Sequence, residues 1–258
     1  MTYYKSIRTL VVSLLLATAA TSPSLAQTVE TSGPTHFPKV QIKVNSPQDG
    51  PIMRDNQLTL REAIAITNGT LTTAELSNAE QQQVAPGSTN SVIAFDLPAD
   101  DTTIELQSLL PALAQPGLVI DGTTQAGYDA TKSATAEISV AIPVVEITVA
   151  DKAEVLRGLT LVADDITIRG LSLYGFTSEH TSTQSTPPAD IFIAHELPPP
   201  DISEQRTPAS HFSFHDENHP PQGIVIEQNW IGIPVDNTIP PQPSAFRISV
   251  FKSQGVNI

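Results

Sequence analysis

The sequence predicts an all-β chain of short strands, and three observations support this class. Short runs rich in Val, Ile and Leu recur from residue 91 onward and are separated by Asn, Asp, Gly and Pro turns. The unit Arg-Gly-Leu-x-Leu occurs twice, at residues 157–161 and 169–173. No helical pattern long enough for a βαβ crossover lies between the runs. Periodicity leaves two architectures open, a repetitive solenoid and an antiparallel sandwich.

Residues 1–26 have the pattern of a secretory signal peptide. Lys5 and Arg8 precede a short apolar run at 10–17, and small residues precede the predicted cleavage after Ala26. We expect a secreted or cell-surface protein, with an uncleaved membrane anchor as the alternative. No later segment approaches the roughly 18 unbroken apolar residues of a membrane span, so we predict no transmembrane segment in the mature chain.

The composition limits the classes of partner and cofactor. With 13 Lys and Arg against 27 Asp and Glu, the formal net charge is −14, which argues against nucleic acid and against cation-free binding of anionic polymers. The chain has no cysteine, so an exported form must be stabilised by its core or by metal, as suits a bacterial secreted protein. We predict no cofactor, with calcium or zinc as possible exceptions.

Residues 27–90 are predicted to form a leader and an N-terminal cap. The alternating residues 40–44 predict a strand. Thr59 and Glu62 have the spacing of a capping box that starts a short helix, and Gly69 is a natural C-terminal stop. Polar residues 73–84 predict a second helix.

Residues 91–258 are predicted to hold the strands. The expected strands are 92–95, 103–106, 118–120, 144–149, 156–161, 166–173, 224–226 and 246–251. Two Pro-rich stretches, 181–222 and 234–243, interrupt them and are interpreted as long loop insertions, which are usually functional or disordered.

Three motifs decide between the two architectures by resemblance. They are Leu58-Thr59-Leu60-Arg61-Glu62-Ala63-Ile64, the stretch 119–128 with Asp121-Gly122-Thr123-Thr124-Gln125-Ala126-Gly127-Tyr128, and the stretch 226–232 with Asn229 at a turn. From about residue 52 to 233 the chain resembles secreted right-handed parallel β-helix repeat proteins with a Cys-Ser-Leu-Arg-Glu-Ala signature. Leu58 and Thr59 stand here in place of Cys-Ser.

The resemblance implies a right-handed parallel β-helix, a solenoid with a short N-terminal capping helix. Its interior would hold Ile120, Leu159, Leu161, Ile166, Ile168, Leu171, Leu173 and Ile226. Because residues 255–258 read as a new strand without a terminal cap, we expect an incomplete C-terminal end, continued by missing coils or covered by end-to-end assembly. The family is defined by its scaffold, so the resemblance implies no activity.

Three histidines are the candidate metal ligands. At helical spacing, His211, His215 and His219 would place three imidazoles on one face, as a zinc site requires. The Phe residues between them and Pro220-Pro221 argue against a long helix, so a polar loop is the preferred interpretation and no metal site is predicted.

Candidate catalytic groups do not converge on a predicted site. Asp164-Asp165 falls in a turn, where Asp bonds its own backbone, so no acid pair for glycoside hydrolysis is expected. Arg157 and Arg169, with Glu146 and Glu227, outline a face on which a lyase could act, but arginines that cap carbonyls or lie solvated are the preferred interpretation.

The sequence therefore favours a non-catalytic role. We predict a bacterial cell-surface or extracellular scaffold with a binding or adhesion function, whose partner is an extracellular glycan or a surface protein. The alternative is a carbohydrate-active enzyme, a polysaccharide lyase or glycoside hydrolase. No catalytic residue is assigned.

Overall fold

The computed structural model describes residues 38–133, 140–178, 187–194, 220–251 and 253–258, all within the compact unit His36–Ile258. The predicted signal peptide and the candidates His211, His215 and His219 lie outside the described residues. Strands dominate the described part and helices are few and short, which confirms the all-β class.

The strands and helices have the following bounds. The strands are β1 (Val40–Val44), β2 (Val84–Pro86), β3 (Val92–Phe95), β4 (Thr103–Leu106), β5 (Val119–Asp121), β6 (Val145–Val149), β7 (Arg157–Leu161), β8 (Thr167–Arg169), β9 (Leu171–Leu173), β10 (Ala189–Ala194), β11 (Val225–Glu227), β12 (Trp230–Ile231) and β13 (Ile248–Phe251). The helices are α1 (Leu60–Thr67) and α2 (Asn78–Gln81), with 3-10 turns η1 (Thr73–Glu75) and η2 (Gly122–Thr124).

The strands form three sheets, here called A, B and C. Sheet A has the order β11-β8-β5-β3-β1-β2, sheet B the order β12-β9-β6-β4, and sheet C the order β13-β10-β7. Neighbours within each sheet pair in parallel, except that β2 pairs with β1 in the antiparallel sense. Because parallel neighbours need a crossover, no strand pairs in parallel with the one that follows it directly in the chain.

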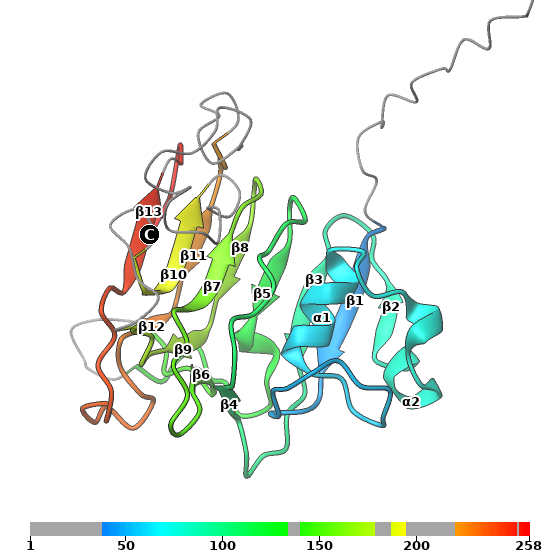
Figure 1. Ribbon diagram of the computed structural model, residues 1–258, viewed down its shortest axis with the longest axis horizontal. Helices are drawn as coiled ribbons and strands as arrows, with labels where there is room; N and C mark the ends of the chain where they lie inside the picture. The colour runs from blue at the N-terminus through cyan, green and yellow to red at the C-terminus, as the bar shows by residue number, and fades with distance from the viewer. Residues whose placement is uncertain (1–37, 134–139, 179–186, 195–219, 252) are drawn as a thin grey trace, which may run out of the picture. The chain divides into compact units, whose positions relative to one another are not determined.

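The chain visits the three sheets in a fixed order. Strands β5, β6 and β7 lie in sheets A, B and C, and the next two passes repeat this order with β8-β9-β10 and β11-β12-β13. Each pass lies beside the one before it (Figure 1). Before β5, strands β3 and β4 occupy sheets A and B, and Leu113 pairs with Leu161 at the edge of sheet C.

The repeated passes align side chains of the same kind in columns. One column in sheet A consists of the aligned residues Ile42, Ile93, Ile120, Ile168 and Ile226, each no more than 3% exposed. Since side chains alternate along a strand, the neighbours of these isoleucines face outward. The interior residues predicted from the sequence are confirmed as buried.

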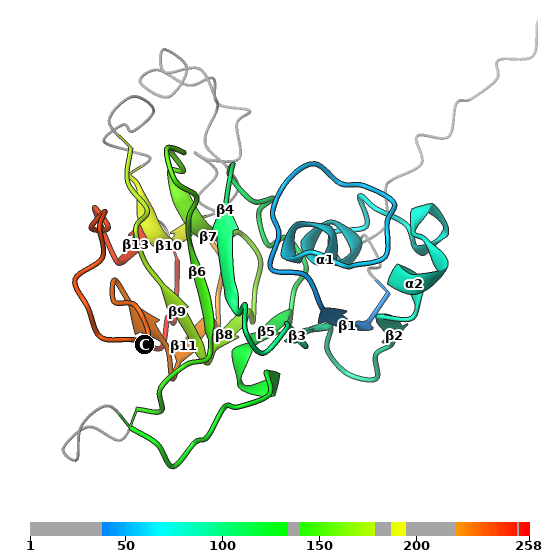
Figure 2. The ribbon, with the colours of Figure 1, turned by 90° about the horizontal axis from the view of Figure 1, so that it is seen from below.

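Helix α1 forms where the sequence predicts it. The Thr59 hydroxyl accepts a hydrogen bond from the Glu62 amide, and the Glu62 carboxylate accepts one from the Thr59 amide at 2.9 Å, which is the predicted capping box. Glu62 also accepts a bond from the Met53 amide at 3.1 Å. Gly69 follows with a φ of 71°. The helix lies beside β1 (Figure 2). Seven of its eight residues are buried, and Arg61 is the exception.

The single helix predicted for residues 73–84 is wrong. Two capping boxes, Thr72 with Glu75 and Ser77 with Glu80, each start a short turn, so the segment breaks into η1 and α2. Each box satisfies its own backbone amides locally, which favours two separate starts over one continuous helix. The residues after α2 form β2, which pairs with β1.

The long loop predicted for residues 181–222 needs correction at its centre. Residues Ala189–Ala194 form β10, the middle strand of sheet C, and every residue of the strand is buried. Flanking prolines gave the stretch a loop-like composition, but the six-residue run Ala-Asp-Ile-Phe-Ile-Ala contains none, so its amides are free to join the sheet. The second Pro-rich stretch, 234–243, has no strand or helix and connects β12 to β13, as expected of a loop.

Candidate functional site

Two rows of side chains face outward from sheet A. The first row is Val92, Val119, Thr167 and Val225, aligned across β3, β5, β8 and β11. The second row, two residues further along each strand, is Ala94, Asp121, Arg169 and Glu227. Parallel pairing in register therefore places one arginine between two carboxylates on adjacent strands.

Arg169 forms ion pairs with both acids of the second row. Its Nη2 lies 2.6 Å from Oδ2 of Asp121, and its Nη1 lies 3.9 Å from Oε1 of Glu227. The Asp121 side chain is 7% exposed, whereas those of Arg169 and Glu227 are 39% and 48% exposed. We call Asp121, Arg169 and Glu227 the charged triad. Asp121 is its buried, structural member, and Glu227 is its accessible acid.

A local turn fixes the Asp121 carboxylate. Its Oδ1 accepts hydrogen bonds from the Thr123 amide at 3.1 Å and from the Thr123 hydroxyl at 2.5 Å. Burial raises the pKa of Asp121, but the hydrogen bonds from Arg169 and Thr123 and the charge of Arg169 outweigh it, so the pKa lies below its usual value. Asp121 also holds the pKa of Arg169 above its usual value through their hydrogen bond, against partial burial. Both groups stay charged at neutral pH.

All residues of the two rows except Ala94 form the floor of an open groove of about 510 Å³, here called the sheet A groove. Its remaining walls come from Gln41 on β1 and from the loop Ser88–Asn90. The groove combines an apolar strip, three side-chain hydroxyls, two side-chain amides and the charged triad. Such a set offers both donors and acceptors around a ligand without a large excess of either charge.

The two predicted arginines occupy different environments. In the first repeat Arg157 begins β7 in sheet C, whereas the second repeat turns a corner between β8 and β9 at Gly170, whose φ is 69°. Arg157 is only 2% exposed, and its guanidinium carbon lies 3.9 Å from the ring centre of Phe192. Burial lowers the pKa of Arg157 to about 10. The repeated unit therefore does not place two arginines on one face.

The predicted acids are also dispersed. Glu146 lies on β6 in sheet B, so it does not share a face with Glu227 on β11 in sheet A. The turn predicted at Asp164-Asp165 is confirmed, because the Asp164 carboxylate accepts a bond from the Gln222 amide at 2.9 Å and Asp165 has a φ of 56°. Of the candidate face residues, only Arg169 and Glu227 come together.

Sequence reasoning missed Asp121 as a site residue. It belongs to a motif that was noted for its resemblance, and only the strand register brings it beside Arg169, which is 48 residues away in the chain. The rest of this motif braces the fold. The Gln125 side chain bonds both the amide and the carbonyl of Leu97, at 2.8 and 3.0 Å, and the Thr124 hydroxyl accepts a bond from the Phe95 amide.

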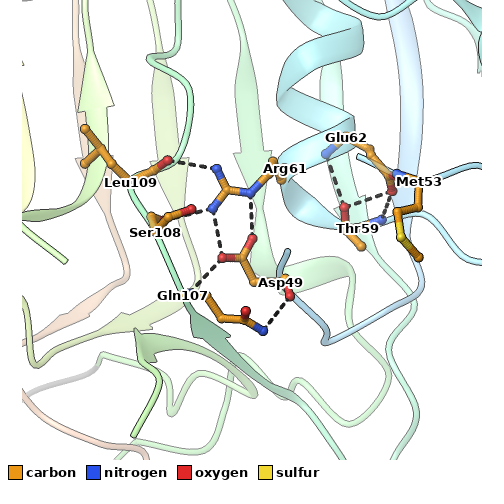
Figure 3. A network of polar contacts seen from close by, with 8 residues as sticks. All are labelled: Asp49, Met53, Thr59, Arg61, Glu62, Gln107, Ser108 and Leu109. Carbon is orange, nitrogen blue, oxygen red and sulfur yellow. Dashed lines mark hydrogen bonds and ion pairs between the residues drawn. The ribbon is translucent and has the colours of Figure 1, made fainter. Parts of the chain in front are cut away.

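The arginine of the N-terminal motif also has a structural role (Figure 3). Arg61 binds both carboxylate oxygens of Asp49 at 2.8 Å and donates to the carbonyls of Leu109 and Ser108 at 2.8 and 2.9 Å. The same carboxylate accepts a bond from the Gln107 amide. Every guanidinium nitrogen of Arg61 is thus engaged, and four of its five N–H donors are used within the fold.

Asn229 lies at the turn predicted for it. Its carbonyl oxygen accepts a bond from the Leu171 amide at 3.0 Å, and its amide group donates to the Ile168 carbonyl at 2.8 Å. It therefore ties the turn between β11 and β12 to the backbone of the preceding pass.

No group of three or more metal-ligating side chains occurs among the residues that the structure describes. In the same residues, no helix combines the length and the apolar character of a membrane span. No protein-family model, curated protein or solved structure matches this chain. A function must therefore be argued from the groove itself.

Proposed function

We propose that the chain is an exported right-handed parallel β-helix protein with a non-catalytic binding role, and that the sheet A groove binds a neutral glycan. Three passes through the sheets in the same order support the solenoid, and parallel crossovers are right-handed in about 98% of cases. The pattern of residues 1–26 supports export.

The charged triad is the observation on which the binding role depends. Asp121 is deprotonated and Arg169 is protonated at neutral pH, because each stabilises the charged form of the other. A general acid or base must exchange a proton near the working pH, and neither group is poised to do so. Asp121 instead fixes the direction of Arg169, whose side chain is 39% exposed and can donate hydrogen bonds to a ligand.

A neutral glycan suits this groove better than an anionic one. Arg169 already faces two carboxylates, so a uronic acid would meet repulsion from Asp121 and Glu227. Sugar hydroxyls, in contrast, can donate to the exposed Glu227 carboxylate and accept from the amides of Gln41 and Asn90. The apolar strip of Val92, Val119 and Val225 fits the C–H faces of a sugar ring.

The test is a glycan array followed by titration calorimetry with groove variants. Glu227→Gln removes the accessible carboxylate, and Thr167→Trp fills the centre of the floor. We expect both to weaken binding of a neutral oligosaccharide by about tenfold or more. Lys132→Gln, at an exposed position outside the groove, is the matched control and should bind as the unchanged protein does.

The enzyme alternative has its own readout in the same experiment. Incubation with neutral and anionic polysaccharides, with and without calcium, should release no new chain ends. Depolymerisation that disappears in Arg169→Gln would overturn the non-catalytic role. Absence of saturable binding to every glycan tested would overturn the binding role.

A further inference from the structure

A second cavity lies on the outward side of sheet B, whereas the triad lies on sheet A. Its volume is about 380 Å³, within the range of small-molecule sites. Its floor comes from β4 and from the end of β6, its wall from Tyr174 and Gly175 after β9, and its roof from Pro241 and Gln242 of the 234–243 segment. We call it the Tyr174 pocket.

The Pro-rich roof is fixed to the sheet by hydrogen bonds at both of its ends. Near its start, Glu146 accepts a bond from the Val235 amide at 2.9 Å, and the Ser172 hydroxyl donates to the Ile233 carbonyl at 2.7 Å. Near its end, the Gln242 amide group donates to the Gly175 carbonyl at 2.7 Å. A pocket whose roof is tied down is formed before the ligand arrives, which lowers the entropic cost of binding.

Tyr174 presents a neutral phenol at this pocket. Burial and the charge of Glu146 raise its pKa to about 12, so it keeps its proton under physiological conditions. The Tyr174 hydroxyl is held by hydrogen bonding with the side chains of Thr148 and Glu146, so the residue offers a ligand an apolar ring and a hydroxyl oxygen that can accept a hydrogen bond. This combination matches a ligand with an apolar face and hydroxyls at its rim.

The other lining residues extend the same match. Val149, Ala150 and Pro241 add apolar surface beside the ring. Glu105, Thr148 and Asp151 add acceptors, and Lys152 adds donors. With two carboxylates against one ammonium among these residues, an anionic ligand is disfavoured.

We propose that the Tyr174 pocket is a second saccharide site, which takes one neutral pyranose ring. It lies on a different sheet from the triad, so this site does not depend on the sheet A groove. If both sites bind, one chain engages a glycan at two points, which strengthens attachment by raising the effective concentration at the second site.

The experiment measures binding of neutral monosaccharides and oligosaccharides to the full chain by saturation-transfer NMR and calorimetry. Ala150→Trp fills the pocket, and Glu105→Gln replaces an exposed carboxylate by a neutral amide of similar size, which leaves the floor intact. We expect Ala150→Trp to weaken binding at this site by about tenfold or more, and Glu105→Gln to weaken it by a smaller factor. Thr167→Trp, which blocks only the sheet A groove, should leave the site saturable.

The outcomes separate this site from the sheet A groove. Loss of binding in Thr167→Trp alone, with unchanged binding in both Ala150→Trp and Glu105→Gln, would overturn the second site and leave the groove supported. Loss of binding in Ala150→Trp and Glu105→Gln, with unchanged binding in Thr167→Trp, would support the second site alone. A thermal melt of each variant checks folding, and Glu105→Gln decides the matter if Ala150→Trp fails to fold.

Discussion

At the scale of single residues, the buried charges of sheet C are the least expected feature. Asp190 on β10 is fully buried, and neither of its carboxylate oxygens has a hydrogen-bond partner of normal geometry. Burial raises its pKa to about 7, although the Ser244 side chain, the Phe176 backbone and the charge of Arg247 act in the opposite direction. An unpaired buried carboxylate is costly when ionised.

This pKa makes stability depend on pH. Below the unfolded value of 3.8, Asp190 is neutral in both states and has no effect. As pH rises toward 7, the folded state holds a proton that the unfolded state has lost, so stability falls, and the loss is complete above the folded pKa. We expect Asp190→Asn to stabilise the protein at pH 8 by up to about 4 kcal/mol and to change little at pH 4.

Urea unfolding of Asp190→Asn at both pH values is the measurement. Asp100→Asn, at an exposed position, is the control and should change stability by less than about 0.5 kcal/mol at either pH. Destabilisation of Asp190→Asn at pH 8 would show that the carboxylate is ionised and paired in the folded protein.

A second residue-scale prediction concerns close backbone contact. A Cβ on Gly122 would lie 2.2 Å from the Gly170 carbonyl oxygen and 2.7 Å from Leu171 Cδ2. Because this carbonyl is part of the adjacent pass and cannot easily move, we expect Gly122→Ala to lower the free energy of unfolding by about 1–3 kcal/mol. Thermal and urea unfolding would measure the loss.

Gly127→Ala separates the contact from backbone strain. Gly127 has open space around its Cβ position but a φ of 94°, so its cost comes from strain alone, at about 1 kcal/mol. Equal effects of the two substitutions would contradict the contact as the cause at Gly122.

Residue environments were the part of the site that the sequence could not predict. Arg157 and Arg169 occupy the same place in a repeated unit, yet one is buried against Phe192 and the other lies half-exposed beside Asp121. The difference arises from where the chain turns, since Gly158 continues a strand and Gly170 makes a corner. Local sequence does not encode which glycine turns.

At the scale of elements, Arg61 on α1 binds Asp49 and the chain just after β4, and we call this set of contacts the Arg61 clamp. It should contribute strongly to the free energy of unfolding. The side chains of Arg61 and Asp49 are 11% and 1% exposed, and their bidentate pair is extended by the carbonyls of Ser108 and Leu109. Arg61→Met leaves Asp49 buried without its cation. We expect a loss of about 3–5 kcal/mol in the free energy of unfolding, measured in urea.

Two comparisons test the clamp. Lys132→Gln removes an ion pair with Asp129 whose lysine side chain is 73% exposed, and it should cost less than about 0.5 kcal/mol. Adding Asp49→Asn to Arg61→Met should recover part of the loss, because the unpaired charge is then removed. A loss under about 1 kcal/mol for Arg61→Met would mean that the clamp is not a stabilising contact.

Elements with strong local signals were predicted well, and those with mixed signals were not. The capping box at Thr59 located the start of α1, apolar alternation located β1, and a short apolar run located β3. Strand β10 was hidden by the prolines around it. Two capping boxes divided the segment that was expected to be one helix. The division was not predicted because hydrophobic periodicity does not show where such a segment breaks.

At the scale of the whole molecule, the buried apolar residues form one large cluster in which the aligned strands stack their side chains in columns. The passes that build a column are of unequal length, because Asp121 and Arg169 are neighbours at a separation of 48 residues while Asn229 reaches Leu171 across 58. The 12-residue spacing of the repeated unit therefore does not measure a pass. Strand alternation could predict which residues are buried, but not which of them lie side by side.

The isoleucine column of sheet A allows the columns to be tested. Ile120 lies between Ile93 and Ile168 in register, whereas Ile226 has Ile168 on one side and the backbone of Asn257 near the other. A cavity at Ile120 removes contacts on both sides, so Ile120→Ala should cost about 4 kcal/mol, near the upper part of the range for such truncations. Ile226→Ala should lower the free energy of unfolding by only about 2 kcal/mol. Ile226 has an isoleucine neighbour on one side only, so fewer contacts are lost and the surrounding chain can relax into the cavity more easily.

Urea unfolding and amide hydrogen exchange together distinguish a column from a single core. If each pass is stabilised mainly by its neighbours, Ile226→Ala should speed exchange in β11 and β8 while leaving β3 protected, since the interactions are between adjacent passes. Ile120→Ala should speed exchange on both sides of β5. A uniform increase across all of sheet A for both variants would contradict this, because it would show that the passes unfold as one cooperative unit.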